Sequence, residues 1–513
     1  MRRAATAVAA ATLAYSAMVS LWYCVSGSLD HDEHQFMASA FMLARYGLHP
    51  YHDFAYFQMP NLVYLYAPFF LSPYPFLLAR LFVGLCAFAI CLTVFLTGRS
   101  LFAPSQSLTS LIVPASCVLL LIHSPLFRYT SSFVWNHTPS TLCALLAFLA
   151  LCQGLRGKRP MPCFFVSGVI LAVAIGMRLT FAPLVLPFLL AIVALAPDTS
   201  RSARLNAIAF GVGGLLGSIP AITFFFADHK AFLFGNVGYA RLNTLYRQEM
   251  LWPVAMTFAG KLDQLKDSVF QKPGDLLVLL VALCSLALFT VDKVRSGRRA
   301  RFEIVFLLVL MPFVYLGCMA PTPAWYQYFF ASLPFLILLC LYALSGLRGS
   351  PSEEPAGLLF GVAALVSLVY GSPFINDSNV LDIVRPQSWR PVVLHRQAER
   401  IRDYVDSEAG DDTVLTLSPL YAIEAGLPIY REFVTGPFAW RVSHLLSAQD
   451  AANRGLPLPT RIEFFLEERR PRAILTGTED NPQLEMPIVK AAREVGYRPM
   501  VTSMGVVIWL RPD

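Results

Sequence analysis

The sequence predicts a polytopic α-helical membrane protein that ends in a small α/β domain. Of its 513 residues, 56% are hydrophobic and only 14% are charged, whereas soluble domains carry about 25% charged residues. The charge is also unevenly distributed: residues 1–372 hold 24 Lys+Arg and 14 Asp+Glu, and residues 373–513 hold 16 and 19. We therefore expect a membrane domain over 1–372 and a polar domain over 373–513.

Eleven apolar runs are candidate membrane spans. The first extends from the N-terminus to about Cys24, and the others lie at about 76–97, 108–123, 138–155, 161–178, 181–196, 206–227, 274–292, 302–319, 327–345 and 356–372. Several are shorter than the roughly 20 residues that cross a bilayer, so tilted or broken spans are expected. The first run also resembles a signal peptide, but we favour a retained helix because it would tether the acidic segment that follows it.

The basic residues predict the orientation of these spans. Arg2 and Arg3 precede the first span, and 14 of the 24 basic residues of the membrane part fall in short loops on that same side. Because short cytoplasmic loops are rich in Lys and Arg, the N-terminus is expected in the cytoplasm and the loops 26–73 and 228–273 outside. An odd number of spans also puts the C-terminal domain outside. The basic residues therefore indicate topology, and no nucleic-acid partner is expected.

The segment from Leu29 to Pro68 is where chemistry is expected. Its acids and histidines are Asp30, Asp32, Glu33, Asp53, His31, His34, His49 and His52. Acids this close to a bilayer are costly to place and usually serve a function. Residues 32–46 have helical spacing that stops at Gly47, which predicts a helix along the membrane interface with Asp32 and Glu33 in its first turn. Capping of that helix is the alternative role for both acids.

Two short patterns in this segment carry a resemblance to a known family. Behind the Asp32-Glu33 pair stand Gly47-x-x-Pro50-Tyr51-x-Asp53-Phe54 and Tyr56-Phe57-Gln58-x-Pro60. Together they resemble the first external loop of the GT-C glycosyltransferases, in particular the bacterial protein-mannosyltransferase-like and aminoarabinose-transferase-like enzymes. The resemblance implies a multi-pass protein of the bacterial inner membrane with a periplasmic C-terminal domain. It also implies transfer of a sugar from a polyprenyl-phosphate carrier to an acceptor at the outer face.

The same resemblance implies roles for individual residues. Asp32 would be the general base that takes the acceptor proton, with inversion at the anomeric carbon, and Glu33 would be its catalytic neighbour. Asp30 is the rival base. Polar or cationic groups must hold the departing phosphate and the sugar. The candidates for this role are Arg178, His49, His52, Asp53, Tyr56, Gln58, His137, Arg241, Arg247 and Tyr326.

The sequence departs from the family pattern at two places. Aminoarabinose-transferase-like enzymes have Glu-Lys where this chain has Gln58-Met59, so their phosphate-binding lysine is missing here. Many relatives place a second aspartate in the outer loop before the fourth span, at the start of the helix, where this chain has Asn136-His137-Thr138-Pro139. Arg178 stands alone in an apolar stretch, where an unpaired charge is expensive, so an anionic partner is one interpretation and snorkelling to the interface is the other.

The remaining parts are less specific. The loop 228–273 is expected to form one or two short helices that close over a bound donor, or else a solvated connector. In the C-terminal domain, helices at 391–406, 460–468 and 487–495 alternate with strands at 413–417, 472–476 and 505–510. No glycine-rich phosphate loop opens these helices, so nucleotide binding is not indicated.

Three classes of function fit this sequence. A glycosyltransferase would have a polyprenyl-phosphate sugar donor, a lipid, polysaccharide or protein acceptor from the envelope, and membrane lipids as partners. A lipid or oligosaccharide transporter or flippase is the alternative, but transporters place charged or broken helices at the midplane, whereas the acids here gather in one outer loop. A ligase for whole oligosaccharides is the third. Asp32, His31 and Asp53 could also hold a divalent metal ion, although no spacing is diagnostic, and no metal site is predicted.

Overall fold

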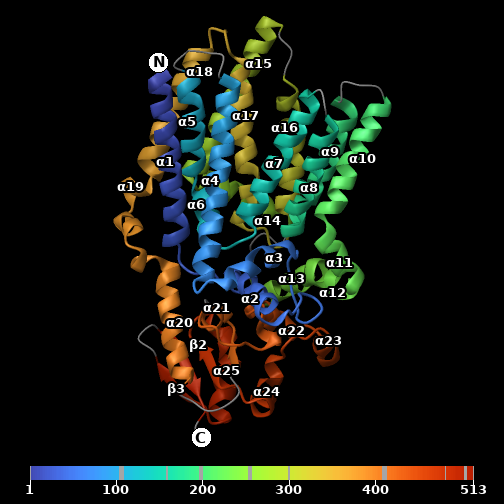
Figure 1. Ribbon diagram of the computed structural model, residues 1–513, viewed down its shortest axis with the longest axis vertical. Helices are drawn as coiled ribbons and strands as arrows, with labels where there is room; N and C mark the ends of the chain where they lie inside the picture. Colours follow the sequence, from blue (N-terminus) through green and yellow to red (C-terminus); the bar gives the residue numbers. More distant parts are fainter. Residues whose placement is uncertain are drawn as a thin grey trace.

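A bundle of long helices and a smaller α/β unit form the two ends of the molecule (Figure 1). The computed structural model describes residues 2–102, 109–157, 160–195, 200–251, 257–297, 301–406, 413–479, 481–501 and 505–511. The N-terminus lies at the free end of the bundle, and the α/β unit lies at the opposite end. A layer of shorter helices lies between the two, and it contains the acidic segment.

The bundle contains the apolar helices that the sequence predicts. They are α1 (Arg2–Ser26), α4 (Pro75–Phe102), α5 (Thr109–Ile122), α6 (Pro125–Ser131), α7 (His137–Arg156), α8 (Pro160–Met177), α9 (Val185–Leu195), α10 (Ser200–Gly217), α11 (Ile219–Ala227), α15 (Pro273–Ser296), α16 (Phe302–Met319), α17 (Leu333–Gly346) and α18 (Glu353–Gly371). In the described ranges, eight helices are long and apolar enough to cross a membrane, or up to ten if each bent pair is one span. The polytopic helical fold is therefore confirmed.

The spans that fall short of the predicted eleven are bent or short. The pair α5 and α6 bends by 63°, and the pair α10 and α11 bends by 60°. Pro125 and Pro220 stand in the first turns of α6 and α11, where proline is tolerated because the N–H groups there have no helical partner. The predicted run 181–196 forms a short apolar helix, Leu179–Leu195.

The helix α2 (His31–Tyr46) belongs to the layer between bundle and α/β unit. It ends at Gly47, whose φ of 66° is left-handed and therefore favours glycine. The sequence predicts a helix with one face on the membrane surface, but residues 33–42 are all buried. The reason is that α21 (Pro419–Glu424) covers α2 from the other side, where the Leu420 N–H donates to His34 Nδ1 at 3.3 Å.

The same layer includes the segment between α11 and α15. It forms α12 (His229–Leu233), a π-helical turn (Phe234–Gly238), α13 (Tyr239–Glu249) and α14 (Phe258–Phe270), which is more helix than the one or two short helices expected. A Cβ at Gly235 would lie 2.2 Å from the carbonyl oxygen of Tyr56. Only glycine therefore lets this segment approach the acidic segment so closely. The helix α3 (Asn61–Tyr66) completes the layer.

The C-terminal unit is built on a four-stranded sheet with the order β1-β2-β4-β3. Strands β1 (Val414–Thr416) and β2 (Ala473–Thr476) are parallel, whereas β4 (Val507–Leu510) pairs antiparallel with β2 and with β3 (Arg498–Val501). Its helices are α20 (Arg390–Asp406), α21, α22 (Pro437–Ser443), α23 (Ala448–Asn453), α24 (Ile462–Arg469) and α25 (Pro482–Glu494). The short helix α19 (Pro373–Asn376) lies beside the bundle instead (Figure 1), where Phe374 packs on Tyr15 of α1. The sequence did not predict β3, which contains Pro499 and lies at the sheet edge, where proline is tolerated.

Candidate active site

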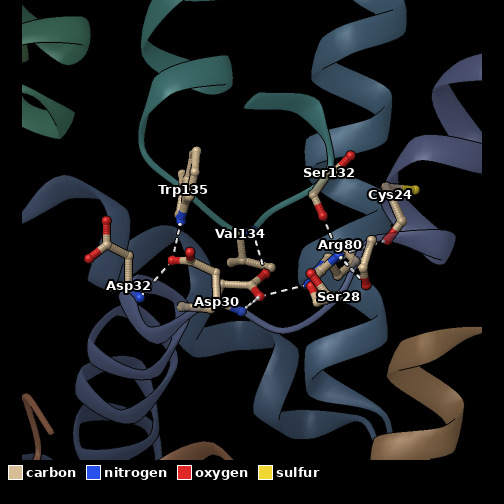
Figure 2. Close-up of polar contacts among 10 residues, drawn as sticks. Cys24, Ser28, Asp30, Asp32, Arg80, Ser132, Val134 and Trp135 are labelled. Carbon is tan, nitrogen blue, oxygen red and sulfur yellow. Dashed lines mark hydrogen bonds and ion pairs between the residues drawn. The ribbon is translucent and has the colours of Figure 1, made fainter. Parts of the chain in front are cut away.

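The first turn of α2 is fixed by a capping box. The Asp30 carboxylate accepts a hydrogen bond from the Asp32 N–H at 2.8 Å, and the Glu33 carboxylate accepts one from the Asp30 N–H at 3.0 Å. Asp30 also accepts from Trp135 Nε1 at 3.0 Å (Figure 2). These bonds satisfy N–H groups that a helix otherwise leaves unpaired. Asp30, rather than Asp32, is therefore the N-cap.

Glu33 also forms a fully buried ion pair. Its Oε2 lies 2.6 Å from Arg80 Nη2, and its Oε1 accepts from the Val134 N–H at 2.7 Å. Arg80 in turn donates to the carbonyls of Ser28 and Ser132 (Figure 2). Burial raises the pKa of Glu33, while the positive charge of Arg80 opposes the rise. Glu33 is not among the residues that line the cavity described next, and its carboxylate binds Arg80, the Val134 N–H and the N-terminus of α2.

Asp32 lies next to Asp30 and Glu33, but only its backbone N–H takes part in their hydrogen bonds. Its side chain extends away from the Asp30 and Arg80 bonds (Figure 2) and faces a cavity of about 630 Å³, called here the main hollow. The side chain is 28% exposed, and His31 Nε2 lies 3.5 Å from Asp32 Oδ1. In the part of the chain that the structure describes, no Lys or Arg nitrogen lies within 4 Å of this carboxylate. Asp32 is thus open to a ligand.

The rival base, Asp30, lines the same hollow but is less available. Two N–H groups already bind its Oδ1. Burial, followed by the negative charge of Asp32, raises the pKa of Asp30 to about 6. A base needs a free oxygen within hydrogen-bond reach of the proton that it takes. One of the two Asp30 oxygens is taken by these bonds, whereas the Asp32 carboxylate accepts no hydrogen bond in the described structure, so Asp32 is the more available of the two.

The main hollow is lined by residues that are far apart in the sequence. They are Asp30, His31, Asp32, Gln58, Tyr129, Tyr239, Asn243, Tyr246, Arg247, Met250, Trp325, Gln327, Tyr328, Phe438, Arg441, Glu479, Asn481 and Leu484. Of the predicted phosphate or sugar ligands, Gln58 and Arg247 are among them. Arg441 was missed because it belongs to the C-terminal domain, where nothing in the segment Gly436-Pro-Phe-Ala-Trp-Arg441 marks it as a ligand.

Arg178 lies in an adjoining cavity of about 440 Å³, called here the side hollow, which shares Gln58, Tyr239, Asn243 and Tyr328 with the main hollow. Its guanidinium donates to Asn136 Oδ1 and to Thr180 Oγ1, each at 2.9 Å, and lies 4.5 Å from the centre of the Tyr328 ring. Asn136 Nδ2 donates to Gln58 Oε1 at 3.2 Å. The two places at which the sequence departs from the family pattern are therefore in contact, and Asn136 connects Gln58 to Arg178.

Three predicted ligands form a turn away from both hollows. The Asp53 carboxylate accepts from the His49 N–H at 2.7 Å and lies 3.0 Å from His52 Nδ1. None of the three lines either hollow. Over the described ranges, no three His, Cys, Asp or Glu side chains lie close enough together to hold a metal ion.

The other predicted ligands are also outside the hollows. Tyr56 is buried in the apolar core of the layer, and Arg241 is exposed on α13. The Tyr326 hydroxyl donates to Asp275. His137 is buried and stacks on the Tyr328 ring, with 5.7 Å between ring centres. Its two ring nitrogens have no hydrogen-bond partner among the residues that the structure describes.

Comparison with solved structures shows that the chain shares its fold with known membrane proteins. ArnT, an aminoarabinose transferase from Cupriavidus metallidurans, matches in its apo state with a TM-score of 0.61 and 12% identity, over 99% of this chain and 98% of that chain. Its structure bound to undecaprenyl phosphate matches with a TM-score of 0.60 and 13% identity, over 98% and 97%.

A second similar structure is the Archaeoglobus fulgidus oligosaccharyltransferase in complex with zinc and sulfate. It matches with a TM-score of 0.50 and 13% identity, over 98% of this chain and 73% of that chain. No family model and no curated protein sequence matches this chain. The likeness is therefore one of fold, and the chain has the GT-C fold over nearly its full length.

Proposed function

We propose that the protein is a membrane glycosyltransferase that transfers a sugar from a polyprenyl-phosphate donor to an acceptor hydroxyl, with Asp32 as the general base. The observation that carries this proposal is the open carboxylate of Asp32 in the main hollow, with Arg247 and Arg441 in the same cavity. A base and a phosphate-binding group must both face the reacting carbon in this reaction. The main hollow brings these groups together.

The reaction forms one bond and breaks one. The acceptor oxygen attacks the anomeric carbon while its proton passes to the Asp32 carboxylate, so that a C–O bond forms and the carbon is inverted. The bond from the anomeric carbon to the phosphate oxygen breaks, and its electron pair stays on the leaving polyprenyl phosphate. Cations beside that oxygen stabilise the developing charge.

The lipid part of the donor is supported by the fold. The similar ArnT structure is bound to undecaprenyl phosphate, and the apolar helices here offer surface for a prenyl chain. Gln58 and Arg178, which line the side hollow next to the main hollow, are proposed to bind the sugar or the lipid head. The segment α12–α13 is proposed as the lid that closes over the donor.

The location follows from the charge pattern. We place the N-terminus in the cytoplasm of a bacterial cell and the C-terminal domain, residues 373–513, in the periplasm. The layer with α2 and the C-terminal domain lies at the end of the bundle opposite the N-terminus, which is consistent with this orientation. The acceptor is then an envelope lipid, polysaccharide or protein.

Mass spectrometry of envelope lipids and glycans tests the proposal. Cells that express the protein are expected to carry one added sugar on an acceptor, and cells with Asp32→Asn are expected to resemble cells without the protein. Addition of a whole chain would instead identify an oligosaccharide ligase. Altered lipid distribution with no new glycosidic bond would identify a transporter and contradict the proposal.

A further inference from the structure

Arg441 is a buried cation without an acidic partner. The residue is 7% exposed, and its one hydrogen bond in the described structure runs from Nη2 to the Tyr239 hydroxyl at 3.0 Å. Its Nε has no hydrogen-bond partner, and no carboxylate oxygen lies within 4 Å of its guanidinium in the described ranges. A buried charge in this condition is expensive unless a ligand pairs with it.

The neighbours of Arg441 hold its guanidinium in place. The guanidinium carbon lies 4.4 Å from the centre of the Phe438 ring and 5.7 Å from that of Tyr246. Tyr239, which accepts its hydrogen bond, stacks on Phe57 with 4.1 Å between ring centres. Arg441 is therefore oriented by aromatic rings from α13, from α22 and from the acidic segment, and its remaining N–H groups are available to a ligand in the main hollow.

A second arginine lines the same cavity. Arg247 comes from α13, and its guanidinium lies 5.5 Å from the centre of the Trp325 ring. Burial, followed by the positive charge of Arg441, lowers the pKa of Arg247, so the two cations are close enough to repel each other. Two arginines held near each other, with one lacking a carboxylate, make a site for an anion that has several oxygens.

We propose that Arg441, contributed by the C-terminal domain, binds the donor phosphate together with Arg247 and so replaces the lysine that the family has at the position of Met59. The proposal rests on the function proposed above. Met59 carries no charge and lines the side hollow, which adjoins the main hollow and shares four lining residues with it, so this position supplies no cation to either. Arg178 already donates to two neutral oxygens, which leaves Arg441 as the less satisfied cation. The C-terminal domain is thus part of the donor site rather than a separate sensor.

Binding of undecaprenyl phosphate to the purified full-length protein tests this assignment, with undecaprenol as the probe that lacks the phosphate. Wild type is expected to prefer the phosphate form. Arg441→Gln is expected to weaken binding of the phosphate form by about 10- to 100-fold, the range for a hydrogen bond to a charged group, and to leave undecaprenol binding unchanged. Arg431→Gln, an exposed arginine of the same domain, is the matched control and is expected to bind both probes like wild type.

Two milder variants keep the test valid if Arg441→Gln misfolds. Arg441→Lys keeps the charge but loses the planar fork, and Tyr239→Phe removes only the oxygen that orients it, so both are expected to weaken phosphate binding by about 3- to 10-fold. Wild-type affinity in both would overturn the assignment of Arg441, while the Asp32→Asn result would still support a glycosyltransferase. Equal binding of the two probes by wild type would instead overturn the lipid-phosphate donor, and the assignment with it.

Discussion

Two of the helices that line the main hollow, α2 and α13, are held in place in opposite ways. In α2, residues 33–42 are all buried, and the first turn is fixed by a capping box and a buried ion pair. In α13, only Tyr239 and Tyr246 are buried. Fewer buried contacts mean a lower cost of local opening. The proposed base Asp32 therefore lies on a rigid helix, α2. The proposed phosphate ligand Arg247 lies on α13, a helix that can shift to fit a bulky lipid.

The substitution with the greatest predicted loss of transfer is at Asp32, on α2. Asp32→Asn keeps the shape of the side chain but removes the base, so transfer should fall by about 10²- to 10⁴-fold with an unchanged unfolding temperature. Asp53→Asn is the matched control, because Asp53 is an acid of the same segment outside both hollows. Equal transfer by wild type and Asp32→Asn would remove the proposed base.

A substitution of Glu33 tests whether the adjacent acids Asp32 and Glu33 have different roles. Glu33→Gln leaves the buried guanidinium of Arg80 without its counter-charge, which should lower the free energy of unfolding by about 3–5 kcal/mol. Denaturant unfolding of the purified protein measures this, and transfer should fall only as far as the folded fraction falls. A variant that unfolds like wild type but has lost transfer would show that Glu33 is catalytic and would contradict its purely structural role.

Removing Arg247 from α13 is predicted to lower the affinity for the donor. Arg247→Gln should weaken binding of the lipid-linked donor by about 10- to 100-fold, seen as a raised KM, because it removes a cation from the main hollow. Arg241→Gln on the same helix is exposed and should change KM by less than about twofold. If Arg241→Gln had the larger effect, the donor would lie on the outer face of α13.

The weakest predicted effect is a pH-dependent change in stability caused by the His395–Glu424 pair of the C-terminal domain. His395 Nδ1 lies 3.0 Å from the Glu424 carboxylate, and this hydrogen bond raises the pKa of His395. The protonated imidazole is thus favoured in the folded state, so the stabilisation is full below about pH 6.5 and is lost as pH rises through the higher folded pKa. The unfolding temperature should fall slightly across that range in wild type and stay flatter in His395→Gln. A steeper fall in the variant would contradict this sign.

The sequence predicts local structure better than it predicts the site. The helix 32–46 and its stop at Gly47 follow from spacing and from glycine chemistry, and the apolar runs follow from hydropathy. The burial of α2 could not be predicted, because it depends on α21, which lies almost 400 residues further along the chain. The strand β3 was missed because Pro499 is compatible only with an edge strand, and edges are set by the whole sheet.

The main hollow is assembled from residues far apart in the sequence. This explains why some of the predicted ligands line it and others do not. Of the residues predicted from the sequence, Asp32, Gln58 and Arg247 line the main hollow. In contrast, His49, His52 and Asp53 bind one another in a turn. Short-range patterns do not separate a ligand from a turn residue. Arg441 carries no local signal, because its importance depends on the packing of α22 against α13.

The position of undecaprenyl phosphate in a structure of its complex with the protein is the decisive measurement. The phosphate is expected in the main hollow, within hydrogen-bond distance of Arg247 and Arg441, with the Asp32 carboxylate facing the open space beside it. A phosphate bound elsewhere, with both arginines unchanged and Asp32 turned away from the lipid head, would contradict this account.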